Sequence, residues 1–275
     1  QRFSPQRGFI EKYDFRKKKL KSIKTYGVSA PQILPAKKDV CSYERMKFEF
    51  IEQGRFKGIA DKCKLKWLKK RCYRTCFLHF DTDRNFVKKT KKGYFFKYFK
   101  LPEEHTGFIS LNVKAEKGGR FFIITDELEM NENYMFRRSG CNDIIVLDLP
   151  KGESRFLSFE PYSVKYLKVI YNTGSELQPE LVLLENSKSV NVEIVGDEKL
   201  NKILQAARST FNQNAVDIFM DCPSRERAGW LCDSYFTGMS ENLFLKSNTI
   251  EKFFLRNFII AENPELERGM LPKCF

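Results

Sequence analysis

The spacing of the apolar residues changes once along this chain, close to Gly196, and this change limits the folds that the chain can adopt. Upstream, short apolar runs alternate with turn-forming sequences such as Lys117-Gly118-Gly119 and Asn172-Thr173-Gly174. Downstream, the apolar residues recur with the three- and four-residue spacing of a helix, as in Leu200, Ile203, Leu204 and Ala207. The sequence therefore predicts a block of strands followed by a block of helices.

Eight short strands are expected in residues 93–193. They are Tyr94–Phe99, Phe108–Val113, Arg120–Thr125, Ile144–Leu149, Phe156–Phe159, Val164–Tyr171, Leu181–Leu184 and Val190–Ile194. His105 lies between the first two, in the turn-like segment 102–107, and is expected to be a turn residue. Because no helical pattern separates these strands, we expect them to form a β-sandwich.

Three helices are expected after Gly196. The first follows Asp197, a residue type that caps helix N-termini, and runs to about Asn214. The second spans residues 234–244, and the third spans residues 249–261. Apolar side chains surround much of the third helix, namely Phe253, Phe254, Phe258, Ile259 and Ile260. Because three helices cannot bury such a surface by themselves, we expect this helical layer to be incomplete.

These patterns divide the chain into three regions. Residues 1–90 are expected to form a basic, β-containing N-terminal region, residues 91–195 the β-sandwich, and residues 196–275 the beginning of a helical domain. The fold class is therefore multidomain, with β structure followed by α structure. The chain begins at Gln1 and stops at Phe275 directly after a helical stretch, so we expect it to be a fragment or a processed chain.

Composition excludes several classes of protein. The chain has 275 residues, of which 42% are hydrophobic, and this is enough apolar material for a packed core. No stretch approaches the ~18–20 consecutive apolar residues that would cross a bilayer, so no membrane insertion is expected. The N-terminal residues do not have the charged and apolar regions of a signal peptide either.

The net charge of +14 comes from the N-terminal part of the chain. Residues 1–100 hold 29 Lys and Arg against 9 Asp and Glu, whereas residues 101–275 hold 20 against 26. A basic region of this kind either attracts phosphates and other anions or forms a solvated lysine-rich face. No nucleic-acid motif accompanies it, and the aromatic residues of 94–99 read as strand core, so no nucleic-acid partner is expected.

Eight cysteines are too few for a disulfide scaffold in a chain of this size. Cys63, Cys72, Cys76 and His79 lie close enough in sequence to suggest a zinc site. Their spacing lacks the paired ligands of structural zinc sites, and His79 would point away from the cysteines on a strand. We therefore expect buried thiols there, with neither a metal nor a cofactor.

The chemistry of the chain is concentrated in the segment between the first two helices. It reads Asp221-Cys222-Pro223-Ser224-Arg225-Glu226-Arg227-Ala228-Gly229-Trp230-Leu231-Cys232-Asp233. Pro223 and Gly229 indicate a shaped loop instead of a continuous helix. Clustered carboxylates raise the pKa of one of their number, as a general acid requires. Alternatively, Arg225 and Arg227 neutralise the two aspartates in a structural ion-pair network, which leaves Glu226 as the odd carboxylate.

This segment resembles the sugar-site loop of bacterial α-L-rhamnosidases, glycoside hydrolase family 78. Nine residues fall in register with the family pattern, namely Asp221, Cys222, Pro223, Arg225, Glu226, Arg227, Gly229, Trp230 and Asp233. Cys232 replaces the usual glycine, and an optional aspartate before the glutamate is absent. A weaker similarity extends upstream to about residue 90. The resemblance implies β-sandwich domains followed by an (α/α)6 barrel of the six-hairpin type, of which this chain holds the first helices.

The resemblance also implies an activity and a role for each site residue. The activity is the inverting hydrolysis of terminal α-L-rhamnosyl or related deoxysugar linkages. Glu226 would be the general acid, Asp221, Arg225 and Asp233 would hydrogen-bond the sugar hydroxyls, and Trp230 would pack on the C5-methyl face of the sugar. The catalytic base would lie downstream, outside this chain, so the 275 residues alone are expected to be inactive.

Three functions are compatible with these patterns. The loop favours a glycosidase acting on a rhamnose-containing glycoside or oligo- or polysaccharide, and the bulk of Cys232 allows for another deoxysugar. The sandwich and the basic region are also compatible with a non-enzymatic carbohydrate-binding or adhesion module. The basic region by itself suggests a binder of anionic polysaccharide or nucleic acid. Related bacterial enzymes occur both inside cells and beyond the inner membrane, so the resemblance assigns no compartment.

Overall fold

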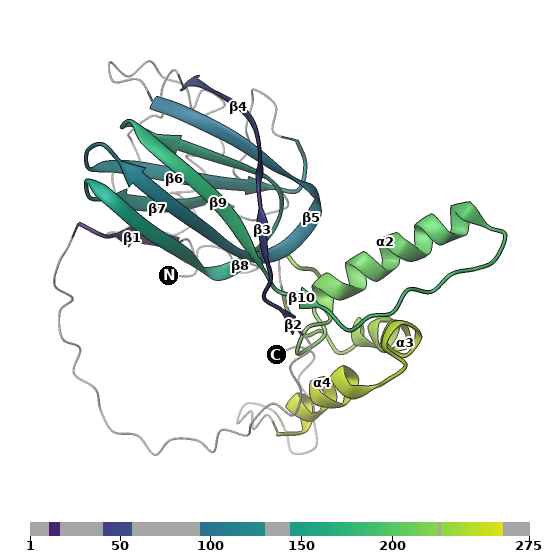
Figure 1. Cartoon of the computed structure of the whole chain (residues 1–275). Coiled ribbons are helices and arrows are strands. Elements are labelled where there is room, and N and C mark those ends of the chain that lie inside the picture. Colours follow the sequence, from purple (N-terminus) through teal and green to yellow (C-terminus); the bar gives the residue numbers. More distant parts are fainter. Residues whose placement is uncertain (1–10, 17–40, 57–93, 130–143, 225–226, 261–275) are drawn as a thin grey trace, which may run out of the picture.

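The computed structural model of this chain describes residues 11–16, 41–56, 94–129, 144–224 and 227–260. The strands in these ranges are β1 Glu11–Asp14, β2 Cys41–Ser42, β3 Arg45–Lys47, β4 Glu49–Phe56, β5 Tyr94–Ala115, β6 Gly119–Asp126, β7 Ile144–Leu149, β8 Gly152–Tyr171, β9 Ser175–Leu183 and β10 Glu185–Asn186. The helices are α2 Glu198–Asn214, α3 Ser234–Leu245 and α4 Thr249–Ile260. Strands therefore precede helices, as predicted (Figure 1).

Two long strands, β5 and β8, organise the sheet. The strand order is β1-β7-β6-β8-β5-β9-β3, and β4 also pairs with β5. Residues 94–100 of β5 pair with β4 and with residues 166–171 of β8, whereas residues 107–115 pair with β9 and, in part, with residues 152–157 of β8. Each long strand thus passes from one half of the sheet to the other.

The two halves pack face to face around a single apolar core. Members of the core come from both halves, for example Phe99, Phe121 and Leu147 from the first and Leu111 and Leu181 from the second. All five side chains are buried. The rings of Tyr13 on β1 and Phe156 on β8 meet edge to face, with their centroids 5.0 Å apart. This is a β-sandwich made by bending one continuous sheet.

The segment around His105 does not form the turn that the sequence predicts. β5 continues through it, and its pairing with β8 shifts register between Lys100 and His105 and again between Phe108 and Ser110. Pro102 lies within the first irregularity and Pro161 borders the second, at places where a proline's missing N–H removes no regular ladder bond. The strands therefore bend there instead of ending. The predicted strands of 94–99 and 108–113 form one strand, as do those of 156–159 and 164–171.

The prediction of a strand at Val190–Ile194 is wrong. The described backbone of this segment is neither strand nor helix. The N–H of Val190 donates to the carbonyl of Phe244 at the end of α3, and the N–H of Ile194 donates to the side chain of Asn201 on α2. The segment lies against helices, so its hydrogen bonds go to them and not to a neighbouring strand.

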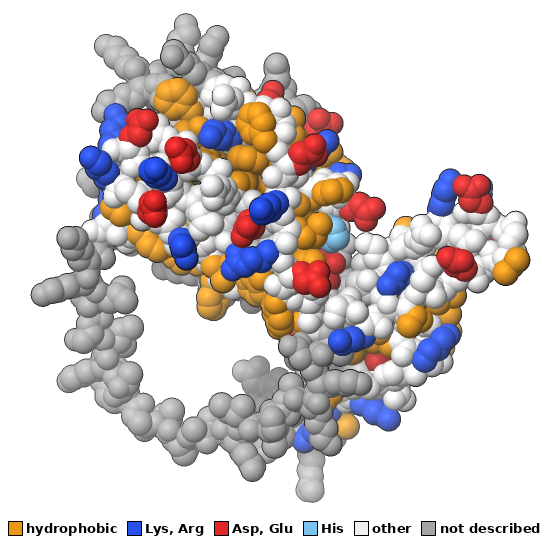
Figure 2. Space-filling model, viewed as in Figure 1, with side chains coloured by type: hydrophobic (Ala, Val, Ile, Leu, Met, Phe, Trp, Pro, Cys, Tyr) orange, Lys and Arg blue, Asp and Glu red, His pale blue; other side chains and the backbone are white. Residues whose placement is uncertain are grey.

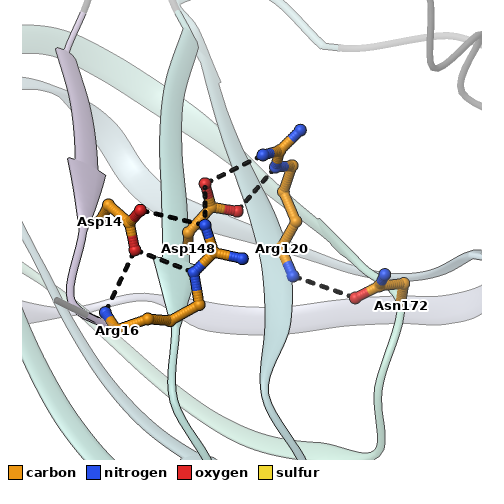
Figure 3. A network of polar contacts seen from close by, with 5 residues as sticks. All are labelled: Asp14, Arg16, Arg120, Asp148 and Asn172. Carbon is orange, nitrogen blue, oxygen red and sulfur yellow. Dashed lines mark hydrogen bonds and ion pairs between the residues drawn. The ribbon is translucent and has the colours of Figure 1, made fainter. Parts of the chain in front are cut away.

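A polar network holds the edge strand β1 to the sheet (Figure 3). Arg120 binds both oxygens of the buried Asp148 carboxylate, with Nε 2.7 Å from Oδ1 and Nη2 2.9 Å from Oδ2. Arg16 reaches the same carboxylate at 3.4 Å and pairs with Asp14 at 2.8 Å. The backbone N–H of Arg120 also donates to Asn172. Asp148 thereby joins residues that follow β1 to strands β6 and β7.

The three helices begin close to the residues that the sequence indicates. The Asp197 side chain accepts the N–H of Leu200 at 2.8 Å and caps α2, which confirms the predicted cap. Seven buried residues form the core between the helices, namely Phe211, Ala215, Phe219, Phe244, Ile250, Phe254 and Phe258. The apolar stripe predicted on the first helix is not buried along its length, because Ile203 is 56% exposed.

Apolar side chains remain at the surface of all three helices (Figure 2). Among the exposed ones are Ile203, Tyr235, Phe236, Met239, Leu255 and Ile259. Ile259 on α4 is 76% exposed although Phe258 beside it is buried. The part of the helical layer that the structure describes therefore buries one side of these helices and leaves another uncovered. Within the described residues, no helix combines the length and the apolar character needed to cross a membrane.

Buried polar side chains join the helical part to the sandwich. Gln213 on α2 accepts the hydroxyl of Thr106 at 2.9 Å and donates to the carbonyl of Glu104 at 3.2 Å. Asn186 on β10 donates to the carbonyl of Ala215 at 2.8 Å. These bonds fix the end of α2 against the bend of β5, and the segment that follows α2 therefore begins at a fixed point on the sandwich.

Candidate active site

The segment predicted to carry chemistry is a loop between α2 and α3, which we call the site loop and define as residues 217–233. The structure describes it except for residues 225–226, so Arg225 and Glu226 lie outside the described residues. The N–H of Met220 donates to the carbonyl of Asn214 at 2.8 Å, and an isolated bridge joins Ala215 to Phe219. The loop therefore starts against the end of α2 and does not continue the helix.

Asp221 closes the site loop through two bonds to one residue. Its backbone N–H donates to the carbonyl of Ala228 at 3.1 Å, and its carboxylate Oδ1 accepts the N–H of Ala228 at 3.0 Å. Its other oxygen, Oδ2, lies 3.5 Å from the Cys222 thiol. Asp221 and Ala228, seven positions apart in the sequence, are thus held together. Asp221 is half-buried, and each carboxylate oxygen has a second lone pair for a further donor.

Trp230 and Asp233 lie where the loop enters α3. The N–H of Trp230 donates to the carbonyl of Ala228 at 3.2 Å, and the carbonyl of Trp230 accepts the N–H of Ser234 at 3.1 Å. Asp233 precedes the first turn of α3, its side chain makes no capping bond, and it is exposed. A carboxylate at this place is favoured by the positive end of the helix dipole. Asp221, Trp230 and Asp233 thus place two carboxylates and an indole ring close together in sequence on one segment.

Arg227 does not neutralise either aspartate of the loop. Its guanidinium pairs with the carboxylate of Glu160 on β8, and its Nη1 donates to the carbonyl of Pro161 at 2.9 Å. The pairing that the structure gives Arg227 is therefore with the sandwich, and it differs from the alternative in which Arg227 neutralises Asp221 or Asp233. The reason is that the bend of β8 brings two acceptors from another part of the chain to the guanidinium, whose fork suits paired acceptors.

The site loop contains two cysteine thiols, Cys222 and Cys232. Cys222 is half-buried and Cys232 is exposed, with the Cys232 sulfur 3.7 Å from the Asp233 carboxylate. The described residues contain no group of three or more His, Cys, Asp or Glu that could hold a metal ion. The cluster of Cys63, Cys72, Cys76 and His79 lies outside the described residues. The arrangement offers hydrogen-bond acceptors and a flat apolar ring, which are the groups that bind a sugar.

Sequence reasoning missed Glu160 and Pro161 as partners of the site loop. They lie between the predicted strands 156–159 and 164–171, 67 and 66 residues before Arg227, where a glutamate reads as a solvent-facing side chain. Pro161 is the one sequence signal for this contact. A proline within a strand marks an edge or a bulge, where a backbone carbonyl can accept a hydrogen bond from another part of the chain. Nothing local in the sequence identifies Arg227 as its partner.

The comparisons with known proteins agree with the resemblance that the loop predicts. Residues 195–274 match the family model of the bacterial alpha-L-rhamnosidase 6 hairpin glycosidase domain. These residues include the whole site loop and all three helices. A comparison with curated protein sequences gives no match.

Two solved rhamnosidase structures resemble this chain in fold. The α-L-rhamnosidase from Dictyoglumus thermophilum is 21% identical, with a TM-score of 0.54, over 65% of this chain and 21% of that one. The family 78 rhamnosidase of Bacillus sp. GL1 is 18% identical, with a TM-score of 0.53, over 61% of this chain and 18% of that one. This chain spans about a fifth of their length. The predicted resemblance and the fold class, a β-rich region followed by helices of a six-hairpin glycosidase domain, are thus confirmed.

Proposed function

We propose that this protein is a glycoside hydrolase that removes terminal α-L-rhamnosyl or related deoxysugar residues with inversion at the anomeric carbon. The observation that carries the proposal is the site loop, which lies within the residues that match the family model and is closed by the paired bonds between Asp221 and Ala228. Glu226 lies between these two residues in the sequence, and the described residues on either side of it, Ser224 and Arg227, belong to the site loop.

We assign the roles within the loop as follows. Glu226 protonates the glycosidic oxygen as the leaving group departs. Arg225, Asp221 and Asp233 hydrogen-bond the hydroxyls of the sugar, and the exposed position of Asp233 at the start of α3 supports its role. Trp230 packs against the apolar C5-methyl face, because an indole ring offers a large flat surface for such a face.

An inverting mechanism also requires a base that activates water. The base and the acid lie roughly 6.5–9.5 Å apart in such enzymes, which leaves space for the water molecule. We propose that the base is not supplied by these 275 residues and that they show no turnover alone. The chain spans only 18–21% of the solved rhamnosidases that it resembles, which supports this proposal.

The proposal includes the division of the chain. Residues 196–275 begin the catalytic domain, residues 91–195 form the sandwich beside it, and residues 1–90 form a basic N-terminal region. Strands β1, β3 and β4 pair within the same sheet as β5–β9, so part of the N-terminal region contributes to the sandwich. Arg227 of the site loop forms an ion pair with Glu160 of the sandwich, so the sandwich contributes to holding the loop in place.

Cys232 bears on which sugar is preferred. Its side chain is exposed and its sulfur lies beside the Asp233 carboxylate, where the family pattern has glycine. The added bulk next to a residue that binds the sugar narrows the space there. We therefore expect the preferred sugar to be rhamnose or a deoxysugar of similar shape, and Cys232→Gly to widen the range of sugars accepted.

The experiment that tests the function is a panel of aryl glycosides offered to the protein as its gene encodes it. We expect release of the aryl group from the α-L-rhamnoside or a related 6-deoxyglycoside, and NMR should show the sugar first in the inverted anomeric form. Retention of the anomeric configuration would contradict the inverting mechanism. Binding of L-rhamnose without any hydrolysis would favour the carbohydrate-binding module instead.

A further inference from the structure

Hydrogen bonds within the sandwich hold the backbone of Glu160, the residue that pairs with Arg227. The N–H of Glu160 donates to Oε1 of the buried Glu11 carboxylate at 2.9 Å. The carbonyl of Glu160 accepts the Ser158 hydroxyl at 2.7 Å, and the same hydroxyl oxygen accepts the N–H of Ile109 at 2.9 Å. Both polar groups of the Glu160 backbone are therefore hydrogen-bonded, the N–H to Glu11 on β1 and the carbonyl to Ser158 on β8 itself, so its carboxylate leaves the sheet from a fixed point.

Arg227 meets this point with two groups at once. Its guanidinium pairs with the Glu160 carboxylate and also donates to the carbonyl of Pro161 at 2.9 Å. The two side chains are only 15% and 11% exposed, so water screens the pair weakly. Because an arginine fork that binds two acceptors has one orientation, the pair fixes both the direction and the position of the arginine.

The backbone of Arg227 has a conformation that few residues adopt without a cause. Its φ is 49°, in the left-handed region that favours glycine. Such a conformation persists only where the surroundings determine it, and it occurs at functional sites. Two contacts surround Arg227. On one side its guanidinium pairs with Glu160, and on the other the next residue, Ala228, makes two hydrogen bonds with Asp221.

We propose that Glu160 is a positioning residue, through which the β-sandwich sets the conformation of the site loop by way of Arg227. Arg227 directly follows Glu226 in the sequence, so the pair fixes the backbone immediately after the proposed acid. The catalytic meaning of this proposal rests on the proposed function. The structural part of the proposal, that Glu160 holds the site loop in place, is independent of the proposed function.

The structural part is tested by hydrogen exchange in this 275-residue chain. The variant is Glu160→Gln, and the control is Glu180→Gln, which removes the charge from the Arg45–Glu180 ion pair between β3 and β9. The reporters are the hydrogen-bonded amides of Asp221, Ala228 and Trp230. We expect them to exchange at least tenfold faster in Glu160→Gln and at the wild-type rate in Glu180→Gln. Equal rates in both variants would overturn the proposal.

A second variant covers the case in which Glu160→Gln does not fold. Arg227→Lys keeps the positive charge but loses the fork that binds Glu160 and Pro161 together. The same amides should again exchange faster, while the Ile250 amide, which donates to Glu241 within the helical part, should keep its rate. Faster exchange at Ile250 as well would indicate general loosening and would contradict a role confined to the loop.

The catalytic part is tested by kinetics in the protein as its gene encodes it. A positioning residue that acts through the loop should change kcat more than KM, and we expect Glu160→Gln to lower kcat by roughly 10–100-fold with KM within threefold. The double variant Glu160→Gln with Arg227→Lys should be no slower than the slower single variant, because both remove one contact. A loosened loop with unchanged kcat would overturn the positioning role. A wild-type protein without turnover contradicts the proposed function instead, and the exchange rates still decide whether Glu160 holds the loop.

Discussion

The carboxylate of Glu241 on α3 accepts the backbone N–H of Ile250, in the first turn of α4, at 2.8 Å. It also accepts the N–H of Glu251 at 2.9 Å, and its side chain is fully buried. One helix thereby supplies the N-terminal cap of the next. The helices are close at this point, because a Cβ added at Gly238 would lie 2.8 Å from the Glu251 carboxylate.

Replacing Glu241 by alanine should separate α4 from α3. The change leaves two N–H groups of the first turn of α4 without their acceptor in a buried place, so we expect a loss of about 1–3 kcal/mol in the free energy of unfolding. Urea unfolding measures it. The control is Glu198→Ala, which removes an exposed acid from the first turn of α2 and should cost less than about 1 kcal/mol. Equal losses of unfolding free energy in the two variants would show that the buried Glu241 carboxylate contributes no more than an exposed acid at a helix start.

Lys168 should make the stability of the sandwich depend on alkaline pH. Its side chain is 2% exposed and its ammonium lies 4.6 Å and 4.4 Å from the ring centroids of Phe96 and Tyr98. Burial lowers the pKa of Lys168 from 10.5 to about 8, and the charge of Glu52 opposes this only partly. Between these two values the unfolded chain binds more protons than the folded chain, so stability should rise with pH across this window.

Urea unfolding at several pH values between about 7 and 10 tests this prediction. Lys168→Met should remove the rise and should be ~1–3 kcal/mol more stable than the wild type near neutral pH, because it no longer buries a charge among aromatic rings. Lys151→Met, at an exposed position, should keep the wild-type slope. A wild-type slope in Lys168→Met would rule out this lysine as its source.

His105 should contribute stability at acidic pH. Its Nδ1 lies 3.1 Å from the Glu185 carboxylate, and this hydrogen bond raises the pKa of His105 above 6.5, helped by the charges of Glu103 and Glu104 and opposed by burial. The folded chain therefore holds the proton to a higher pH than the unfolded chain. The contribution is complete below about pH 6.5 and is lost as pH rises through the raised pKa.

NMR titration of the His105 ring measures this pKa directly. Glu185→Gln removes the negative partner, so the ring should titrate closer to the ordinary histidine value, and the stability gain below pH 6.5 should shrink by about 1 kcal/mol. A ring that titrates at the same pH in both proteins would exclude Glu185 as the cause.

Asp148 should be the most sensitive residue of the β1 edge. Its carboxylate is 3% exposed and pairs with Arg120 and Arg16. Asp148→Asn removes the buried negative charge that both guanidinium groups bind, and we expect a loss of ~2 kcal/mol in the free energy of unfolding. Asp14→Asn removes the charge from the outer pair with Arg16, whose side chain is 54% exposed, and should cost below about 1 kcal/mol. The reverse order of the two losses would contradict the network as described.

The elements that the sequence predicted well are those that local signals determine. The Asp197 cap, the start of the second helix and the turns at Gly118 and Gly174 depend on residues within a few positions, and the structure has them close to the predicted places. The continuity of β5 and β8 was missed because Pro102 and Pro161 read as breaks, although the strands continue through a register shift that contains Pro102 and one that borders Pro161.

In the candidate site, too, features set by nearby residues were predicted and contacts between distant residues were not. Pro223 and Gly229 correctly predicted a loop between two helices. The partner of Arg227 was not predictable, because Glu160 lies 67 residues away and meets it only through the bend of β8. Likewise, Glu241 reads as an ordinary mid-helix acid until α4 is packed against it. Contacts of this kind depend on how distant segments pack, and no local pattern encodes them.

If Glu226 donates the proton to the leaving sugar oxygen, Glu226→Gln must lose turnover, and this loss is measured by kinetics on two substrates. The protein as its gene encodes it is assayed on a rhamnoside with a poor, alkyl leaving group and on the 4-nitrophenyl rhamnoside. We expect a loss of roughly 10²–10⁴-fold on the alkyl rhamnoside and a smaller loss on the nitrophenyl one, whose leaving group needs less protonation. Equal turnover of Glu226→Gln and the wild type on both substrates would contradict it.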